Sequence, residues 1–393
     1  MVALARRAPA GAYRAGHAAP ARRRLSARRH DRPLRVLHVN DQPVGHGGGA
    51  EVNLGRLVAA QRAAGDEPHV LAGEVRHDGV RRALDLWDPA ARRLVARRVT
   101  DLQPDVVHLH NVVRELSPSV IGVIRDRPVV LTVHDMRLLS GSEHHLPHPR
   151  AAADRWILTP VARRAIRRLP AVLAVSETVA ASLRSAGVRS VHVVPVPVPP
   201  PLVAPRAAGE CTDVLFAASL AADKGAHVLL AAFGQVADRF PTARLVLAGS
   251  GPEAAALARA TAPWGSRVLL PGRLDGEGVS RAMGEARVVV VPSLPALRRE
   301  GSSLTAAEAA RHARPVVTSD DPAAAEVART VGGDVVPAGD VGALAGRLDH
   351  WLADPAAATA AGTLAADRAG AYDSGLCAAS VRKVYLEALD GRG

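Results

Sequence analysis

A proline-rich segment at residues 195–201, with the sequence Pro-Val-Pro-Val-Pro-Pro-Pro, divides this chain into two parts that repeat one pattern. On each side of it, short runs of β-branched apolar residues alternate with longer segments of helical period. Continuous apolar strands that alternate with helices are typical of a parallel, doubly wound sheet with helices on both faces. The prolines exclude a helix or a central strand and favour a stiff, extended connector. The sequence therefore predicts the α/β fold class, with two Rossmann-like parallel sheets of similar size.

The apolar runs place the expected strands. In the first part they are residues 35–40, 69–72, 106–109, 129–133, 172–175 and 191–194, and in the second part 214–217, 245–248, 268–270, 288–291, 316–318 and 335–336. Helical segments of the first part are expected around residues 50–64, 90–100, 117–125, 155–168 and 177–186. Ligands of such folds bind at the carboxyl ends of the strands, so we expect the site in the cleft between the two sheets.

The composition is that of a globular protein. With 393 residues, 48% of them hydrophobic, the chain is long enough for two domains with separate cores. No run of eighteen apolar residues occurs, so no transmembrane helix is expected. Cys211 and Cys377 lie far apart in the sequence, which favours a reducing compartment and no disulfide framework. We expect a cytoplasmic protein, with peripheral contact at the inner face of the membrane as an open alternative.

The first 33 residues differ in composition from the rest. They contain nine arginines and one acid, Asp31, and so carry most of the formal net charge of +12. Rich in Ala, Arg and Pro and without apolar periodicity, the segment is predicted to be disordered. We favour an inert tail or a start site assigned too early over a polybasic arm that contacts anionic lipid. No aromatic platform accompanies the arginines, so no nucleic-acid partner is expected.

The segment Glu300-Gly-Ser-Ser-Leu-Thr-Ala-Ala-Glu308 places two carboxylates eight residues apart, after the apolar run at 288–291. Ser302 or Ser303 is a suitable N-cap, so the next helix would present free backbone N–H groups and its positive end to one spot. A diphosphate could bind there while the two glutamates accept hydrogen bonds from sugar and ribose hydroxyls. The plain alternative, which such a pair alone would favour, is a loop acid and a solvated helix residue.

Two features of the first part suggest a ligand. The glycine-rich loop at residues 45–51 follows the first strand, lets the backbone approach a ligand and offers a helix N-terminus to an anion, although a mobile loop is the alternative. His134-Asp135 follow the fourth strand, where a histidine can point into the cleft and donate a hydrogen bond to a substrate oxygen. A structural histidine fits that position equally well. Three further histidines lie in a proline-punctuated loop and do not favour a metal site: they are His144, His145 and His148.

The second part offers a cation and a glycine turn. Lys224 is one of only two lysines, against 48 arginines, and stands at a helix start, where it suits a phosphate. Its attraction to an anion at about 4 Å would be about 4 kcal/mol at an intermediate dielectric constant. A solvated lysine is the alternative. Gly249-Ser-Gly251 form a tight turn that allows a nucleotide or the other domain to approach, and Glu326, at a helix start, is expected to cap or support structure.

Taken in order, these segments resemble the retaining nucleotide-sugar glycosyltransferases of family 4, which have the two-domain GT-B fold. The resemblance runs from about residue 34 to 390 and rests on many weak motifs in the right order. They are Gly-Gly-Ala-Glu at 48–51, Pro104-Asp-Val-Val-His-Leu-His110, His134-Asp135, Val175-Ser176, Lys224-Gly225, Gly249-Ser-Gly-Pro252, the two glutamates 300 and 308, Pro315-Val-Val-Thr-Ser319 and Gly332-Gly-Asp-Val-Val-Pro-Ala-Gly-Asp340. It implies a basic leader at 1–33, an acceptor-side domain at 34–198, a nucleotide-sugar domain at 199–370 and a helix at 371–393 that crosses back to the first domain.

The resemblance also implies roles for individual residues. Glu300 would contact the donor sugar and Glu308 the ribose. Lys224 would neutralise the diphosphate, and His134 would contact the sugar across the cleft. The implied catalytic residues are Glu300, Lys224 and His134. The implied donor-binding residues are Gly48, Gly49, Ser219, Gly249, Gly251, Arg273, Gly301, Ser302, Ser303, Leu304 and Glu308. Those implied on the acceptor side are Glu51, His110 and Asp135.

The resemblance further implies a reaction. A sugar would pass from a UDP- or GDP-linked donor to a hydroxyl of a glycan, glycolipid or small molecule, with retention at the anomeric carbon. No metal and no cofactor would be needed, because fixed dipoles and cations stabilise the departing diphosphate.

One departure from the family pattern keeps alternatives open. Ser219 stands where the family commonly has a phosphate-binding arginine, and Arg298 or Arg299 is an alternative source of the charge. A non-catalytic module that binds nucleotide or supports a partner enzyme is therefore the second hypothesis. A dinucleotide-dependent oxidoreductase is the third, and it would leave the second part of the chain unexplained. Cationic pairs at helical spacing, at 92–98 and 163–168, leave contact with a lipid surface open.

Overall fold

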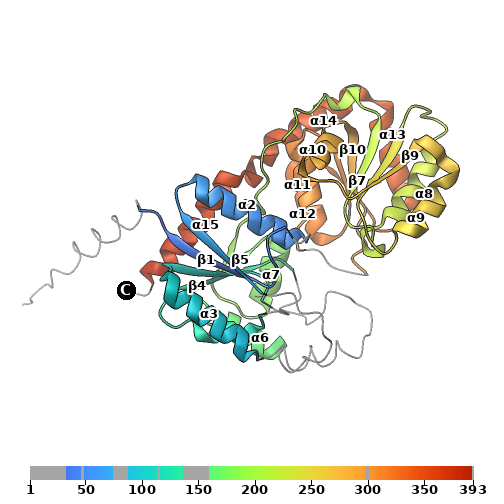
Figure 1. The fold of residues 1–393 in the computed structure, drawn as a ribbon. Coiled ribbons are helices and arrows are strands. Elements are labelled where there is room, and N and C mark those ends of the chain that lie inside the picture. The colour runs from blue at the N-terminus through green and yellow to red at the C-terminus, as the bar shows by residue number, and fades with distance from the viewer. Residues whose placement is uncertain are drawn as a thin grey trace, which may run out of the picture. The chain divides into compact units, whose positions relative to one another are not determined.

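The computed structural model describes residues 32–45, 48–73, 87–112, 116–135, 159–296 and 301–391. From Leu34 onward these residues form one compact unit that contains two six-stranded sheets (Figure 1). The leader at 1–31, the three histidines of the loop at 144–148, and Arg298, Arg299 and Glu300 lie outside the described residues. The predictions made for them therefore stay predictions.

The first sheet has the strand order β2-β1-β3-β4-β5-β6, and every pair in it is parallel. Its strands are β1 (Arg35–Asn40), β2 (Glu67–Ala72), β3 (Val106–Leu109), β4 (Val129–Val133), β5 (Ala171–Ala174) and β6 (Val191–Val193). All six agree with the prediction to within about two residues at their ends. The apolar runs were sufficient to predict these strands, because a strand that is buried on both faces is apolar along its whole length and does not alternate with polar residues.

Helices cover both faces of the first sheet. They are α2 (Gly49–Ala63), α3 (Pro89–Leu102), the 3-10 helix η1 (Pro118–Val123), α6 (Thr159–Ile166) and α7 (Glu177–Ser185). Alternate strand residues point to opposite faces. Val107, Leu109 and Leu131 share a core with Val95 of α3 and Ile166 of α6, whereas Val36, Val106 and Val130 pack with Leu57 of α2. The expected helix at 117–125 is a 3-10 helix instead.

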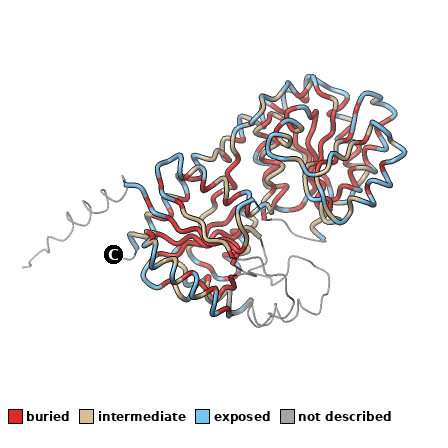
Figure 2. The backbone as a smooth tube through the Cα atoms, in the orientation of Figure 1, coloured by how far each residue is buried: buried red, intermediate tan, exposed pale blue. Residues whose placement is uncertain are grey.

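The second sheet repeats the arrangement, with the order β12-β11-β10-β7-β8-β9 and parallel pairs throughout. Its strands are β7 (Asp213–Ala217), β8 (Arg244–Ala248), β9 (Val268–Gly272), β10 (Ala286–Val291), β11 (Val316–Ser319) and β12 (Asp334–Val336). The central strands β7, β10 and β11 are buried over nearly all of their residues, whereas the edge strands β9 and β12 are mainly half-buried (Figure 2). The prediction of two similar parallel sheets is confirmed.

The second sheet is also covered on both faces. One face packs against α8 (Ala226–Val236) and α13 (Val341–Ala353), and the other against α10 (Gly276–Gly284), α11 (Leu304–Arg311) and α12 (Pro322–Val331). The remaining helical elements are η3 (Ala208–Glu210), η4 (Ala222–Lys224), α9 (Ala254–Thr261), η5 (Ala262–Arg267), α14 (Pro355–Arg368) and η6 (Ala369–Tyr372).

The connector and the last helix join the two halves. The backbone N–H of Val198, in the proline segment, donates to the carbonyl of Tyr372 at 2.8 Å, and Val198 forms an isolated bridge with Asp373. The last helix, α15 (Ser374–Asp390), then packs against α2 and buries Val381 and Tyr385 in the core beneath the first sheet. The expected return of the chain to the first sheet is confirmed.

Cys211 and Cys377 are both buried free thiols, as expected for a chain without disulfides. Across the ranges that the structure describes, no helix combines the length and the apolar character that crossing a lipid bilayer requires.

Candidate functional site

The loop before α11 lies against the ends of β4 and β5. Ser176, two residues after the end of β5, donates its hydroxyl to the carbonyl of Gly301 at 2.6 Å. A Cβ atom at Gly301 would lie 1.8 Å from the carbonyl oxygen of His134, so no other residue fits without a shift of backbone. Gly301, in the segment between the two glutamates of the predicted motif, thereby lies at the carboxyl edge of the first sheet.

The start of α11 has the cap that the sequence predicted. Ser303 is the N-cap, and its hydroxyl accepts a hydrogen bond from the N–H of Ala306 at 3.3 Å. Ser302 is therefore the residue before the cap. The remaining N–H groups of the first turn have no partner within the helix and carry its positive dipole end.

A cavity of about 200 Å³ lies at this edge and gathers most of the predicted site residues. Its described lining comes from α2, from the ends of β3, β4 and β5, from η4 and from the loop before α11. The lining residues are Gly48, Gly49, Ala50, Glu51, Asn53, Asn111, His134, Asp135, Val175, Val196, Lys224, Gly301, Ser302 and Leu304. We call it the inner cavity.

The inner cavity has the charge distribution of an anion site with hydroxyl acceptors beside it. Lys224 ends η4, and its neighbour Gly225 has a φ of 71°, where a Cβ atom would lie 2.0 Å from the carbonyl oxygen of Pro292. The helices α2 and α11 both begin at the cavity, so two positive dipole ends face it. Glu51, buried in the first turn of α2, adds a carboxylate, to which Asn40 donates at 3.4 Å.

A second, larger cavity of about 760 Å³ shares Leu304 with the inner cavity. We call it the outer cavity. Among the predicted residues it is lined by Ser219, Gly249, Arg273, Leu304 and Glu308. A Cβ atom on Gly249 would lie 1.9 Å from the carbonyl oxygen of Ala218, so a glycine is required where the backbone turns beside the cavity.

Gly251 has a different place from the one predicted. It does not line either cavity among the described residues, and its Cα faces the backbone of Leu220, where a Cβ would lie 2.4 Å from the carbonyl oxygen. Its role is the close packing of this turn. The close approach that the sequence predicted exists, but the neighbour is the chain's own backbone.

Glu308 carries an ion pair that the sequence did not reveal. Its carboxylate accepts a hydrogen bond from Nη2 of Arg56, which comes from α2, and both residues line the outer cavity. Nη1 of the same arginine is buried and has no hydrogen-bond partner among the described residues. No sequence signal could have found this pair, because 252 positions separate its members and each has an ordinary helical context.

Glu326 has the structural role that the sequence predicted. From α12 it accepts hydrogen bonds from the N–H groups of Glu177 at 2.7 Å and of Thr178 at 3.0 Å, and it thereby caps the start of α7. The acid caps a helix of the other half, not its own.

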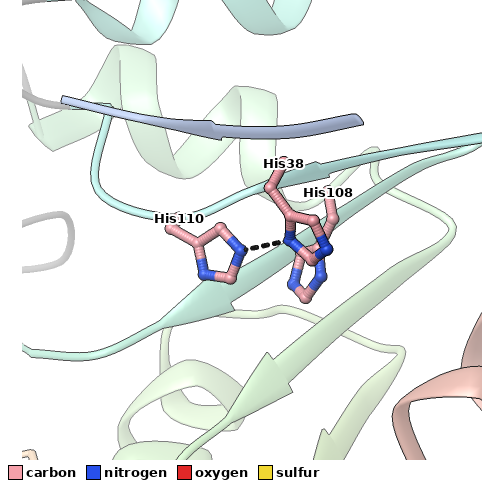
Figure 3. Close-up of side chains that lie close together, drawn as sticks. All are labelled: His38, His108 and His110. Carbon is pink, nitrogen blue, oxygen red and sulfur yellow. Dashed lines mark hydrogen bonds between the residues drawn. The ribbon is translucent and has the colours of Figure 1, made fainter. Parts of the chain in front are cut away.

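Behind the inner cavity lies a row of buried histidines. His110 does not line that cavity; it lies behind His134 and is hydrogen-bonded to it, with His110 Nδ1 and His134 Nε2 3.1 Å apart. His38, which the sequence did not bring to notice, and His108, which was included only in the motif at 104–110, lie beside it (Figure 3). Burial lowers the pKa of His38 to about 4 and holds the pKa values of His108 and His110 well below 6.5.

These three histidines are the one group of described residues close enough to hold a metal ion. Each of their ring nitrogens already has a hydrogen-bond partner, namely Gln61, Tyr385, Thr132, His134 or another of the three. A metal would have to replace several of these bonds at once. The donor set therefore fits a hydrogen-bonded cluster better than a ligand shell.

Comparisons with known proteins agree with this geometry. Two family models match the chain in succession: one described as Glycosyltransferase Family 4 over residues 47–200, and one described as Glycosyl transferases group 1 over residues 211–354. A search of curated protein sequences finds no match.

Solved structures match nearly the whole chain. Sucrose-phosphate synthase from Thermosynechococcus elongatus is 21% identical, with a TM-score of 0.73 over 90% of this chain and 98% of that one. HepE from Anabaena in complex with UDP is 18% identical, with a TM-score of 0.66 over 89% and 99%. A glycosyltransferase from Rickettsia africae is 15% identical, with a TM-score of 0.68 over 91% and 99%. At these identities the likeness establishes the fold, and the expected GT-B arrangement is confirmed.

Proposed function

Because the chain belongs to the group 1, family 4 glycosyltransferases, we propose that it transfers a sugar from a nucleoside-diphosphate donor to a hydroxyl acceptor with retention of anomeric configuration. The observation that carries this proposal is the junction of the two cavities. Lys224 and the starts of α2 and α11 face the inner cavity, and Glu308 faces the outer one. Such an arrangement suits a diphosphate with a sugar on one side and a nucleoside on the other.

The positive groups of the inner cavity suit a departing diphosphate. Negative charge develops on the leaving phosphate as the glycosidic bond breaks, and preorganised cations and N–H dipoles stabilise it most effectively where water is excluded. We assign this task to Lys224, to the N–H groups at Gly49 and to those at Ser302 and Ser303. These groups belong to the chain, so we propose chemistry that needs no metal.

Glu308 is proposed to bind the ribose. Its carboxylate lies at the outer cavity, and the ion pair with Arg56 orients it to accept hydrogen bonds from two hydroxyls. Glu300 is proposed to do the same for the donor sugar. Ser219 and Arg273 line the outer cavity, where they are proposed to contact the nucleotide.

The donor and the acceptor are proposed by chemical class. HepE, which has the same fold, has been crystallised with UDP and with UDP-glucose, so a uridine nucleotide is the first donor to test and a guanosine nucleotide the second. The acceptor is proposed to be a hydroxyl of a glycan, a glycolipid or a small molecule. We propose that it approaches beside Glu51 and Asp135, on the side of the first sheet.

The first experiment is a panel of nucleotides and nucleotide sugars tested for stabilisation of the purified chain against thermal unfolding. A ligand at about 100 times its dissociation constant adds about 2.7 kcal/mol to the free energy of unfolding. We expect one nucleotide sugar to stabilise the protein more than its free nucleotide, and free sugars to have no effect. Absence of stabilisation by every nucleotide sugar would refute the donor site.

The second experiment examines the product. With the donor so identified, the released nucleoside diphosphate is measured with candidate acceptors, and the anomeric configuration of the product is read by NMR. We expect the configuration of the donor sugar. An inverted product would contradict the proposed retention without affecting the donor site.

A further inference from the structure

The face of the first sheet beneath α2 and α15 changes from apolar to polar along the strands. Val36, Val106 and Val130 lie in its core, and the next residues on the same face are polar. His38 of β1 pairs in register with His108 of β3, which pairs with Val130 of β4. Figure 3 shows the imidazoles of His38, His108 and His110 side by side. The row continues to His134 at the inner cavity.

The hydrogen bonds along this row of histidines must run in one direction from donor to acceptor. The pKa values of His38, His108 and His110 are lowered by burial, so at neutral pH these rings are uncharged. A neutral imidazole has one N–H donor and one acceptor nitrogen, and its hydrogen-bond partners decide which nitrogen carries the proton. The position of the proton on one ring therefore determines which nitrogen of the next ring carries the proton.

Gln61 of α2 sets the direction at the far end. Its amide nitrogen donates to the hydroxyl of Tyr385 at 3.1 Å, so its carbonyl Oε1 faces His38 Nε2 at 2.7 Å. An amide oxygen only accepts, so His38 carries its proton on Nε2 and its Nδ1 is an acceptor. The Tyr385 hydroxyl accepts from Gln61 and donates to His108 Nδ1 at 2.6 Å, and His108 Nε2 then donates to the hydroxyl of Thr132 at 2.6 Å.

The hydrogen bonds from His38 to the inner cavity have the same donor-to-acceptor direction. His38 Nδ1 accepts from His110 Nε2 at 3.0 Å, so His110 Nδ1 is an acceptor in turn. It accepts from His134 Nε2 at 3.1 Å, and in a neutral His134 ring the other nitrogen, Nδ1, then carries no proton. At this end the amide nitrogen of Asn53 lies 3.3 Å from His134 Nδ1 and donates to it. The amide of Asn53 thus agrees with the direction that Gln61 sets.

We infer that Gln61, His38 and His110 are positioning residues that hold His134 as the neutral Nε2–H tautomer, so that His134 offers the inner cavity a hydrogen-bond acceptor, Nδ1. The ligand it would take is a hydroxyl group that replaces Asn53 as the donor. That this hydroxyl belongs to a sugar rests on the proposed function. From the sequence, His134 was predicted to donate a hydrogen bond to a substrate oxygen, whereas these hydrogen bonds make its Nδ1 an acceptor.

The tautomers can be measured directly in the full chain without ligand. Nitrogen-15 labelled histidine and long-range proton–nitrogen NMR distinguish protonated from unprotonated ring nitrogens, and each ring is assigned by its substitution. We expect His38, His108, His110 and His134 to carry the proton on Nε2 alone at pH 7.5. A proton on Nδ1 of His134, or on both of its nitrogens, would overturn the inference. This result does not depend on any transferase assay, so it is distinguishable from failure of the proposed function.

A substitution tests whether Gln61, at one end of the row, controls the tautomer of His134 at the other end. Gln61→Met removes the acceptor for His38 Nε2, so His38, His110 and His134 are expected to populate both tautomers, because the amide of Asn53 can turn its oxygen toward His134 Nδ1 when that nitrogen carries the proton. His108 should keep its proton on Nε2, because Tyr385 still donates to its Nδ1, and this reports that the packing is intact. Gln235→Met, an exposed change on α8, is the matched control.

The effect on kcat/KM follows from the populations of the two His134 tautomers. If half of the molecules hold the wrong tautomer, kcat/KM falls about twofold, and it falls further as that fraction rises. In the Gln61→Met variant, an unchanged His134 signal beside an unchanged His108 signal would overturn the inference, because the far end would then have no influence on the cavity.

Discussion

Acidification is expected to destabilise this protein through its buried histidines. The pKa of His38 is about 4 in the folded chain and 6.5 in the unfolded one. A histidine whose pKa is lowered by folding stabilises the fold above pH 6.5, and that contribution is lost as the pH falls toward the folded pKa, because the unfolded chain takes up the proton first. Carboxylates titrate lower, so the window between pH 6.5 and about 5 reports mainly on histidines.

The size of the effect can be worked out for one residue. At pH 5, unfolded His38 is almost fully protonated while the folded ring is mostly neutral. This difference lowers the free energy of unfolding by about 2 kcal/mol relative to pH 8. Burial lowers the pKa values of His108 and His110 well below 6.5, so each adds a loss in the same direction. The loss from His38 alone is a large part of the stability of a typical domain, which is about 5–15 kcal/mol.

The assay is urea unfolding followed by circular dichroism at pH 8 and at pH 5. His38→Gln should reduce the difference between the two pH values by about 2 kcal/mol, because one proton uptake is removed. His350→Gln, at an exposed position on α13, is the control and should leave the difference unchanged. If His38→Gln and the unaltered chain lose the same free energy of unfolding between pH 8 and pH 5, the reasoning from burial is wrong.

Four further outcomes are expected. Glu308→Gln should weaken donor binding about tenfold, the size of one charge-assisted hydrogen bond, and unchanged affinity in calorimetry would contradict the ribose role. Gly301→Ala should reduce transfer at least about tenfold, because its Cβ would lie 1.8 Å from the carbonyl oxygen of His134; wild-type turnover would show that the loop yields freely. Ser219→Arg should strengthen diphosphate binding, measured with the free nucleotide, if charge limits this site; a loss of affinity would argue against that. Exposed arginines on α3 and α6 should bind the chain to anionic vesicles at low salt, and indifference to such vesicles in a sedimentation assay would discard membrane contact.

The sequence by itself determined the elements and their order. Apolar runs such as 288–291 and the proline segment act locally, and a buried parallel strand or a proline has few alternative structures. The cap at Ser303 and the glycine turn at Gly249 were visible for the same reason, since each depends on residues within a few positions. The resemblance then supplied roles for residues that the inner and outer cavities bring together.

Only the tertiary structure decided which distant groups became partners. Arg56 and Glu308 are 252 positions apart, Glu326 caps a helix 149 positions away, and Gln61 and Tyr385 are separated by 324. Nothing in a local pattern states which side chain will meet another across a sheet or between two halves. The polarity of His134 belongs to this class, because it is set by an amide and a phenol that the fold, and not the neighbouring sequence, brings to the row of histidines.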